Sequence, residues 1–491
     1  GNLSPDLIER LDFELGVITS MGLTDYFFIL KKVIDHIRDE KVIWNIRGSG
    51  GGSVVLYALG VSHTDPLRHN LLFERFLNPT RVTMPDVDID IEDTFREPLA
   101  KWLQQEYGED KVARILAYGK MKLKAAIREA ARQMGVKPAN IDILSKAVPN
   151  DYSTVEELEA NENFMHLMRQ YVNYQKILDL TRMIVGRDRT ISTHPAGVLI
   201  FDKDFTNYTG LHKPTKDSSG EGGDDDGGFS SLYPAQVDMG AAELAGFVKF
   251  DFLGQRSLSI VAETLKAIKD RHGKELGWDD IPCEYNDAYD IYATGDTVGI
   301  FQVSSDQMRD IFKRLQPKSL DQIVAIISLY RPGPLKYIDP YIERSKGKEY
   351  DLPSEKLKPI LEETYGIMVY QEQIIQTLKL AGFSGGDADT IRRAISKKKI
   401  KEMAKYKDEF IAGMKKNFQM SEEESEKIWD DILEFAGYGF NKSHASSYAE
   451  VSAKTAWLKK NYRLEYLLAS MNCEIKHNDK VMVYVGDARK S

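Results

Sequence analysis

Three aspartates at alternate positions, Asp86, Asp88 and Asp90, are the strongest sign of chemistry in this sequence. In a β-strand, alternate side chains point to one face, so the three carboxylates would lie about 6 to 7 Å apart along it. Such crowding raises their pKa values unless cations neutralise them. Oxygen ligands suit Mg²⁺ or Mn²⁺, and two ions about 4 Å apart would form a phosphoryl-transfer site. The alternative is a solvent-facing edge strand that uses aspartates against aggregation.

A glycine-rich turn begins at Arg47, Gly48 and Ser49, about 37 residues before the acidic strand. Backbone N–H groups of such a turn can approach phosphate oxygens, and the N-terminus of a following helix would add a favourable dipole. Arg47 adds a permanent positive charge. No Gly-Lys-Ser/Thr ends the turn, so it is not a Walker A motif. A plain flexible turn is the equal alternative.

A second strand, over residues 248–252, alternates Lys249 and Asp251 with apolar side chains. The alternation places the cation and the carboxylate on one face. The strand could therefore carry one phosphate contact and one metal ligand, although an isolated aspartate on a strand is normally without function.

A basic stripe is formed by Lys120, Lys124, Arg128 and Arg132, which recur every four residues on a predicted helix. This spacing keeps them on one slowly drifting face. The phosphate backbone of a duplex suits such a stripe, and an ordinary solvated face explains it equally well.

His444 ends the run Gly-Tyr-Gly-Phe-Asn-Lys-Ser-His at 437–444. No other His or Cys lies nearby in the sequence, which argues against zinc. A histidine beside a lysine and two aromatics could meet the sugar or phosphates of a nucleotide. On spacing alone, a capped helix start with a hydrogen-bonded histidine is the better interpretation.

The elements that must position these residues follow from periodicity and turn signals, and no fixed-period repeat is visible. Helices are expected over residues 5–19, 25–38 and 54–59, and strands over 42–46, 84–91, 197–201, 232–237 and 247–252. Residues 95–185 are expected to be mostly helical, as is the chain from 254 onward. The pattern predicts a mixed α/β unit interrupted by a helical insert and followed by a long helical region.

Composition places the chain among globular proteins: 491 residues, 42% apolar and 29% charged. The net charge of −9 hides local asymmetry, because residues 390–416 hold ten Lys or Arg against three acids, whereas residues 217–228 hold five acids and no base. Two distant cysteines exclude a disulfide framework and fit a reducing compartment. No apolar run reaches 18 residues, so a soluble intracellular protein is expected.

Seven blocks in order resemble the alpha (polymerase) subunits of bacterial DNA polymerase III, the C-family replicative polymerases. The blocks are RGSG at 47–50, LFERFLNP at 72–79, PDVDID at 85–90, VKFDFLG at 248–254, YRPGPL at 330–335, VYQEQ at 369–373 and FAGYGFNKSH at 435–444. The resemblance implies an α+β multidomain fold with a polymerase-β-like nucleotidyltransferase palm, an inserted helical thumb and large, mainly helical fingers. It assigns residues 1–95 and 181–255 to the palm, 96–180 to the thumb and 256–491 to the fingers.

The resemblance also implies residue roles in a DNA-directed DNA polymerase. Asp86, Asp88 and Asp251 match catalytic carboxylates that hold two Mg²⁺ ions, or Mn²⁺ in their place, with Asp90 as a neighbour rather than a principal ligand. The nucleotide would meet Arg47, Gly48, Ser49, Lys249, Arg392, Arg393 and His444. Lys124, Arg128 and Arg132 match the thumb helix that tracks the duplex, and Lys120 continues that stripe.

The implied partners are primer–template DNA and deoxynucleoside triphosphates, without a membrane, in the cytoplasm at the nucleoid. Family members usually carry a PHP domain before this region and clamp-binding modules after it. Contacts with a sliding clamp and other replisome proteins are therefore expected to use domains that this chain lacks, and the chain is expected to be a polymerase core or a naturally short or split relative. The acidic stretch 217–228 is expected to be a mobile insertion between palm strands.

Two competing functions remain open at the level of sequence. One is a non-catalytic DNA-binding scaffold, against which the clustered aspartates argue. The other is a different nucleotidyltransferase or a nuclease that uses the same palm, and the cations at 392 and 393 argue against a nuclease.

Overall fold

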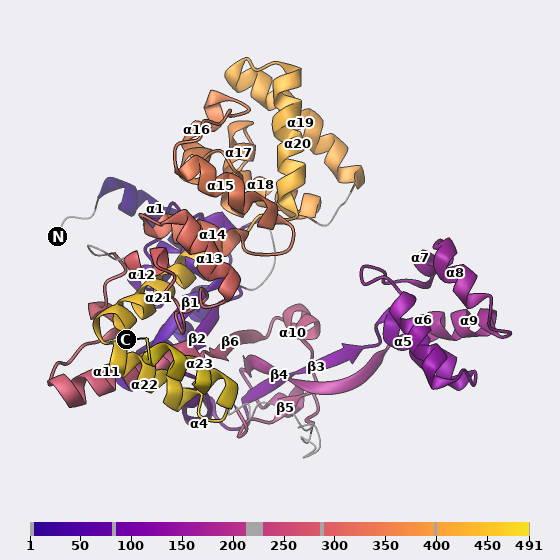
Figure 1. The fold of residues 1–491 in the computed structure, drawn as a ribbon, viewed down its shortest axis with the longest axis horizontal. Coiled ribbons are helices and arrows are strands. Elements are labelled where there is room, and N and C mark those ends of the chain that lie inside the picture. The colour runs from indigo at the N-terminus through magenta and orange to yellow at the C-terminus, as the bar shows by residue number, and fades with distance from the viewer. Residues whose placement is uncertain (1–3, 81–84, 213–228, 285–288, 397–399, 491) are drawn as a thin grey trace. The chain divides into compact units, whose positions relative to one another are not determined.

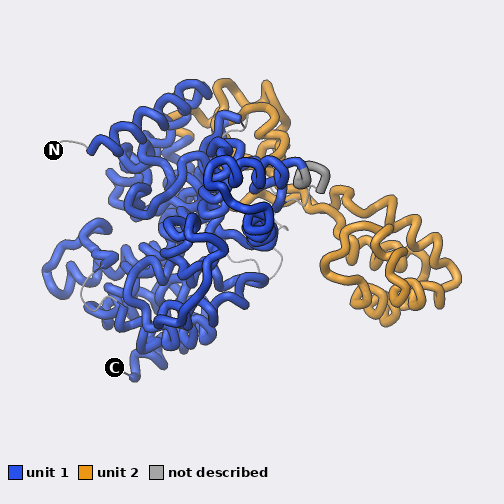
Figure 2. Tube along the Cα trace, turned by 90° about the horizontal axis from the view of Figure 1, so that it is seen from above, with its two compact units in different colours: residues 1–103, 227–231, 248–491 blue, residues 104–226, 232–247 orange. Residues whose placement is uncertain are grey.

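The computed structural model describes residues 4–80, 85–212, 229–284, 289–396 and 400–490, which form a mixed α/β protein rich in helix (Figure 1). The acidic stretch 217–228 lies outside these residues. The chain divides into two compact units (Figure 2). The first comprises Gly1–Leu103, Gly227–Ser231 and Val248–Ser491, and the second comprises Gln104–Asp226 and Leu232–Phe247.

Three strands of the first unit pair side by side: β1 (Trp44–Arg47), β2 (Asp88–Ile91) and β6 (Val248–Gly254). β2 lies between the other two, antiparallel to β1 and parallel to β6. In this register Asp88 is opposite Arg47 on one side and opposite Asp251 on the other. Residues more than 150 positions apart in sequence therefore meet at one level of the sheet.

The apolar residues of these strands hold the sheet in the core. Ile46, Ile89 and Phe250 are fully buried, as the period-two alternation predicts. The ring of Tyr26, on α2 (Thr24–Asp39), stacks on Phe250 with centroids 5.0 Å apart. The polar positions of the same strands are left to face the site.

Helices make up the rest of the first unit. They are α1 (Pro5–Ser20), α2, α3 (Val54–Ala58), α4 (Arg96–Tyr107, which ends in the second unit), α11 (Arg256–His272), α12 (Asp290–Ala293), α13 (Asp306–Leu315), α14 (Leu320–Leu329), α15 (Ile338–Ser345), α16 (Lys358–Leu361), α17 (Gln371–Leu380), α18 (Gly385–Ser396), α19 (Ile400–Phe418), α20 (Glu422–Ala436), α21 (Lys442–Asn461), α22 (Arg463–Cys473) and α23 (Asn478–Ala488).

Helix α21 is buried along most of its length because its sequence is rich in Ala and Ser, whose small side chains permit close approach. Ser447 donates hydrogen bonds from its hydroxyl to the Ile46 carbonyl and receives one from Asn45 Nδ2, both on β1. This helix therefore packs directly on the sheet edge that carries the site (Figure 1).

The second unit contains β3 (Val112–Lys120), β4 (Asp188–Ile200) and β5 (Pro234–Ala235). β3 pairs antiparallel with β4 and parallel with β5. Its helices are α5 (Leu123–Gln133), α6 (Pro138–Ala147), α7 (Val155–Glu159), α8 (Glu162–Met168), α9 (Tyr174–Ile184) and α10 (Met239–Ala245). Helices α5 to α9 share a core of their own, built around Ile127, Leu144, Phe164 and Leu178.

The expected elements are largely confirmed, with two corrections in the second unit. Residues 95–185 are mostly helical, as expected, but β3 occupies nine of them and is a strand that the sequence pattern did not predict. The strand expected at 197–201 begins at Asp188, since its first half pairs with β3. The start of the strand expected at 84–91 includes Met84, outside the described residues, and the regular strand begins at Asp88.

No single helix among the described residues is long and apolar enough to cross a bilayer. Only α1 and α2 taken together reach the required length and hydropathy, and they are bent by 111°.

Candidate active site

An acidic cluster lies at the paired strands of the first unit. Asp86, just before β2, Asp88 on β2 and Asp251 on β6 each direct a carboxylate oxygen to within 4.8 Å of the others. Among the described residues, no other three His, Cys, Asp or Glu side chains bring ligand atoms this close. The strand register explains the cluster, because parallel pairing sets Asp88 directly opposite Asp251.

Two cations partly neutralise this cluster. Lys249 Nζ donates to Asp251 Oδ2 at 2.7 Å and lies 2.8 Å from Asp86 Oδ1. Arg47 Nε lies 3.6 Å from both Asp88 Oδ2 and Asp90 Oδ1. The three carboxylates of the cluster and the carboxylate of Asp90 therefore face only two basic side chains, so negative charge remains in excess.

The electrostatics of the cluster follow from burial and like charge. Burial and the neighbouring Asp86 raise the pKa of Asp88 to about 7, against the opposing effect of Arg47. Burial raises the pKa of Asp90 to about 6. Burial lowers the pKa of Lys249, but Asp251 and Asp86 outweigh that effect and raise it. A divalent cation would relieve the repulsion that raises the pKa of Asp88.

The residues present fit a hard divalent cation. Asp251 Oδ1 is buried and has no hydrogen-bond partner, so one oxygen of this carboxylate lacks a protein donor. The cluster offers only oxygen ligands, which Mg²⁺ and Mn²⁺ prefer. Asp90 is different: it is 2% exposed, and its Oδ2 accepts a hydrogen bond from Tyr448 Oη at 3.3 Å.

The glycine-rich turn follows β1 as a short 3-10 helix, Gly48–Gly52. Gly48 has φ of +77°, and a Cβ there would lie 3.6 Å from Asp88 Oδ2, so the turn passes close to the cluster. From the sequence alone, the N-terminus of the helix after this turn, α3, is expected to face a phosphate. This expectation is wrong, because a side chain of the protein already occupies that N-terminus. The Glu14 carboxylate accepts from the Val54 and Val55 N–H groups, at 3.0 and 3.1 Å.

His444 lies in the first turn of α21, and its Nδ1 accepts a hydrogen bond from the Gly48 N–H at 3.2 Å. The expected capped helix start is also present, because Asn441 Oδ1 accepts from the His444 N–H. Burial, Arg47 and Arg331 lower the pKa of His444 to about 4, so the ring is neutral at pH 7. The structure thus brings His444 to the glycine-rich turn.

Arg392 and Arg393 lie on α18, where both guanidinium groups bind the carboxylate of Asp389. Arg75 belongs to the same charged group: burial, and then the charge of Arg392, lower its pKa to about 10. Among the described residues, no hydrogen bond or ion pair joins Arg392 or Arg393 to the acidic cluster. Ser49 is partly exposed in the turn.

The basic stripe belongs to the second unit and is only partly helical. Lys120 is the last residue of β3, where it pairs with Asp188, so it is not on the helix that the spacing suggested. Lys124, Arg128 and Arg132 do share α5. Arg128 binds Asp142 at 2.8 Å, and Arg132 binds a glutamate on its own helix.

Several side chains that organise the site carry no sequence signal of their own. Tyr448 bridges Arg47 and Asp90, and Asp389 joins the two arginines of α18. Tyr26 is buried with its hydroxyl unpartnered, and burial, Asp86 and Asp251 raise its pKa well above the ordinary value. Tyr26, Asp389 and Tyr448 all lie outside the seven blocks that carry the resemblance, so no motif in the sequence pointed to them.

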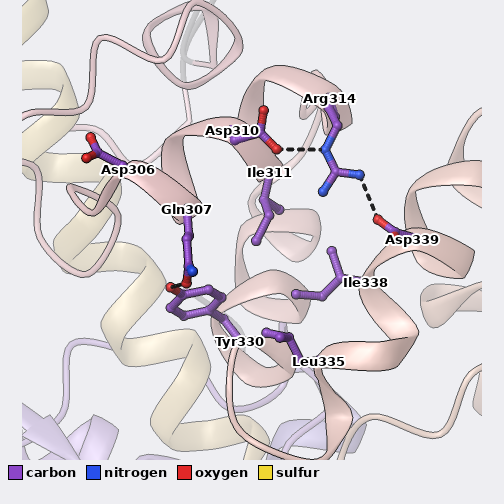
Figure 3. A pocket seen from close by; sticks show the side chains of 9 residues that line it. All are labelled: Asp306, Gln307, Asp310, Ile311, Arg314, Tyr330, Leu335, Ile338 and Asp339. Atoms are coloured by element: carbon purple, nitrogen blue, oxygen red, sulfur yellow. Dashed lines mark hydrogen bonds and ion pairs between the residues drawn. The ribbon is translucent and has the colours of Figure 1, made fainter.

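A separate pocket of about 500 Å³ lies between α13 and α15 (Figure 3). The side chains of Ile311, Leu335 and Ile338 converge on it, and Arg314 binds Asp339 on its rim. None of the site residues described above lines this pocket, so it is not the cluster's substrate cavity.

Two family models match consecutive parts of the chain. Residues 1–254 match the one described as the bacterial DNA polymerase III alpha NTPase domain. Residues 257–418 match the one described as the bacterial DNA polymerase III alpha subunit finger domain.

Curated proteins named DNA polymerase III subunit alpha are similar over nearly the whole chain. The proteins from Caulobacter vibrioides, Thermus aquaticus and Bacillus subtilis are 39%, 37% and 36% identical, over 98%, 98% and 99% of this chain. The chain covers 42%, 39% and 42% of their respective lengths. It therefore spans about two fifths of the relatives that it matches.

Proposed function

Because the chain belongs to the family of bacterial DNA polymerase III alpha subunits, we propose that it is the core of a DNA-directed DNA polymerase. It adds a deoxynucleotide to a primer 3′ end and releases pyrophosphate. The observation that carries this proposal is the cluster of Asp86, Asp88 and Asp251, with their oxygens within 4.8 Å and Asp251 Oδ1 unpartnered. A phosphoryl-transfer centre needs such a set of hard ligands.

Asp86, Asp88 and Asp251 would hold two Mg²⁺ ions, for which Mn²⁺ can substitute. The ions, when bound, make the primer hydroxyl more acidic and neutralise charge on the phosphates. Arg47 holds Asp88 and Asp90 in place through its ion pairs, and Tyr448 fixes Asp90 behind the cluster. Asp90 thereby supports the site rather than binding the ions.

The nucleotide triphosphate would be received by groups around the cluster. Lys249 already bridges two of the carboxylates and would turn its charge to the phosphates when the ions neutralise those carboxylates. The partly exposed turn at Gly48 and Ser49 would supply backbone N–H groups. His444, neutral and bound to this turn, would lie beside the sugar.

The DNA duplex would lie along basic surfaces of the second unit. Lys120 and Lys124 are candidates for phosphate contacts, together with Arg128 and Arg132, each of which would exchange a carboxylate partner for phosphate. This assignment goes with a palm in residues 1–95 and 181–255, a thumb in 96–180 and fingers in 256–491. Contacts with a sliding clamp or other replisome proteins would belong to segments that the longer relatives contain.

Pyrophosphate release tests the proposed reaction against its competitors. The chain is mixed with primed template, Mg²⁺ and one deoxynucleotide, and both pyrophosphate and primer length are measured. A polymerase yields one pyrophosphate for each nucleotide added. The Asp88→Asn variant should lower both pyrophosphate release and primer extension to less than a tenth of wild type, while it still binds DNA. Primer shortening without pyrophosphate would indicate a nuclease. DNA binding with no product of either kind would indicate a scaffold.

A further inference from the structure

The carboxylate of Asp389 holds two consecutive arginines of α18 in place. Its Oδ1 accepts from Arg392 Nε at 3.0 Å and Arg392 Nη2 at 2.8 Å, and its Oδ2 accepts from Arg393 Nε at 2.7 Å. Asp389 is 1% exposed, so both of its oxygens are satisfied inside the protein. Charge-assisted bonds of this kind fix the direction of a planar guanidinium.

The guanidinium groups of Arg392 and Arg393 differ in how many of their nitrogens remain free to bind a ligand. The Arg392 side chain is 5% exposed, and Asp389 binds it through two of its nitrogens. The Arg393 side chain is 30% exposed, and Asp389 takes only its Nε. Among the described residues, no hydrogen bond or ion pair involves Nη1 or Nη2 of Arg393. That edge of Arg393 can receive two oxygens of one phosphate.

Three arginines gather at this helix. Arg75 is close enough to Arg392 and Arg393 that both charges act on its pKa, as do the carboxylates of Asp389 and Glu372. Burial, and then the charge of Arg392, lower that pKa to about 10. Asp387, in the first turn of α18, and Glu74, beside Gly385, add further negative charge, so it is the exposed edge of Arg393 that favours an anion here.

Both ends of α18 are fixed by the fold. At the start, Asn78 Nδ2 donates to the Gly386 carbonyl at 2.9 Å. At the end, Ser396 Oγ donates to the Ala436 carbonyl at 2.6 Å. The fold therefore ties α18 to neighbouring segments near both of its ends, and Asp389 sets the direction of each guanidinium.

We propose that Asp389 is a positioning residue and that the two arginines bound to it have different roles. Arg393 contacts the polyphosphate of the nucleotide, whereas Arg392 holds the Asp389 carboxylate in place. This inference rests on the proposed function for the identity of the ligand. The family resemblance gives Arg392 and Arg393 the same role, whereas this proposal gives them different ones. It also adds Asp389, to which the resemblance assigns no role.

Single-nucleotide addition by four variants tests this division. Arg393→Gln raises the KM for the deoxynucleotide about 10- to 100-fold, the loss expected for a charge-assisted contact, with a smaller change in kcat and little change in melting temperature. Arg392→Gln lowers the melting temperature more and raises KM less. Asp389→Asn raises KM as Arg393→Gln does, and Asp389→Glu restores part of the loss.

Binding of inorganic tripolyphosphate, measured by calorimetry without metal or DNA, separates this inference from the proposed reaction. Weakening by Arg393→Gln and Asp389→Asn, but not by Arg392→Gln, supports the division even if the wild-type chain extends no primer. A KM and a tripolyphosphate affinity within twofold of wild type for Arg393→Gln would overturn it. So would a larger loss of affinity for Arg392→Gln than for Arg393→Gln.

Discussion

Replacing Glu14 with alanine removes the group that ties α1 to the glycine-rich turn. The Glu14 carboxylate is fully buried and accepts from Ser53 Oγ at 2.7 Å, from the Val54 and Val55 N–H groups, and from Arg10 Nε at 2.7 Å. It therefore caps α3, the helix that follows the turn. Without it, two backbone N–H groups, the Ser53 hydroxyl and Arg10 Nε lose this acceptor together.

The size of the loss can be worked from these contacts. One buried donor left without a partner costs about 1–3 kcal/mol, and breaking a buried ion pair costs about 3–5 kcal/mol. Arg10 is 20% exposed and keeps its bonds to the Gly52 and Leu71 carbonyls, which lowers its share. We expect Glu14→Ala to reduce the free energy of unfolding by about 4 kcal/mol.

Urea unfolding followed by tryptophan fluorescence measures this loss. All five tryptophans belong to the first unit, so the signal reports the part of the chain that Glu14 stabilises. Glu9→Ala, on the exposed face of the same helix, is the matched control and should change stability by less than about 0.5 kcal/mol. A difference between the two variants below about 1 kcal/mol would refute the capping role.

Further predictions concern protonation, reactivity and steric fit. The raised pKa of Asp88, about 7, means that the carboxylate is protonated below pH 7, so Mn²⁺ affinity measured by calorimetry should fall about tenfold per pH unit below that value, and equal affinities at pH 6 and pH 8 would contradict this. Burial raises the pKa of Cys283 to about 12, so a thiol reagent at pH 8 should modify it far more slowly in the native chain than in urea; equal rates would show the thiol to be accessible. The His444 ring should titrate by NMR with a midpoint near 4, and a midpoint of 6 to 7 would show that it is not held neutral. Gly333→Ala should cost about 1–3 kcal/mol in urea unfolding, because φ is +100° and the new Cβ would lie 2.5 Å from a ring atom, whereas Gly437→Ala, with nothing within 4 Å, is the control that should not match it.

The strands that carry the acidic cluster could be predicted because their period-two patterns are local. Asp86, Asp88 and Asp251 were expected on strand faces, and the structure gathers them. The helical parts of the first unit were also predictable from periodicity and capping residues such as Ser4 and Asn441.

The remaining features depend on contacts between distant segments. β3 pairs with β4 across an insertion of five helices, and no local pattern in residues 112–120 reveals that partner. Lys120 was consequently assigned to a helix. Tyr448 reaches Arg47 across 401 positions of sequence, and Glu14 reaches Ser53 across 39. A single sequence contains no signal for such pairings, since each of these residue types is ordinary in its own segment.

Metal-dependent primer extension by the Asp251→Asn variant tests the central claim most directly. Single-turnover addition of one nucleotide is measured for wild type, for Asp251→Asn and for Asp202→Asn, an exposed aspartate of the second unit. Wild type and Asp202→Asn should extend the primer only when Mg²⁺ or Mn²⁺ is present. Asp251→Asn should bind the same DNA and add nucleotides at less than a hundredth of the wild-type rate. Extension by Asp251→Asn at more than a tenth of that rate, or extension by wild type in EDTA, would contradict a metal centre at these carboxylates.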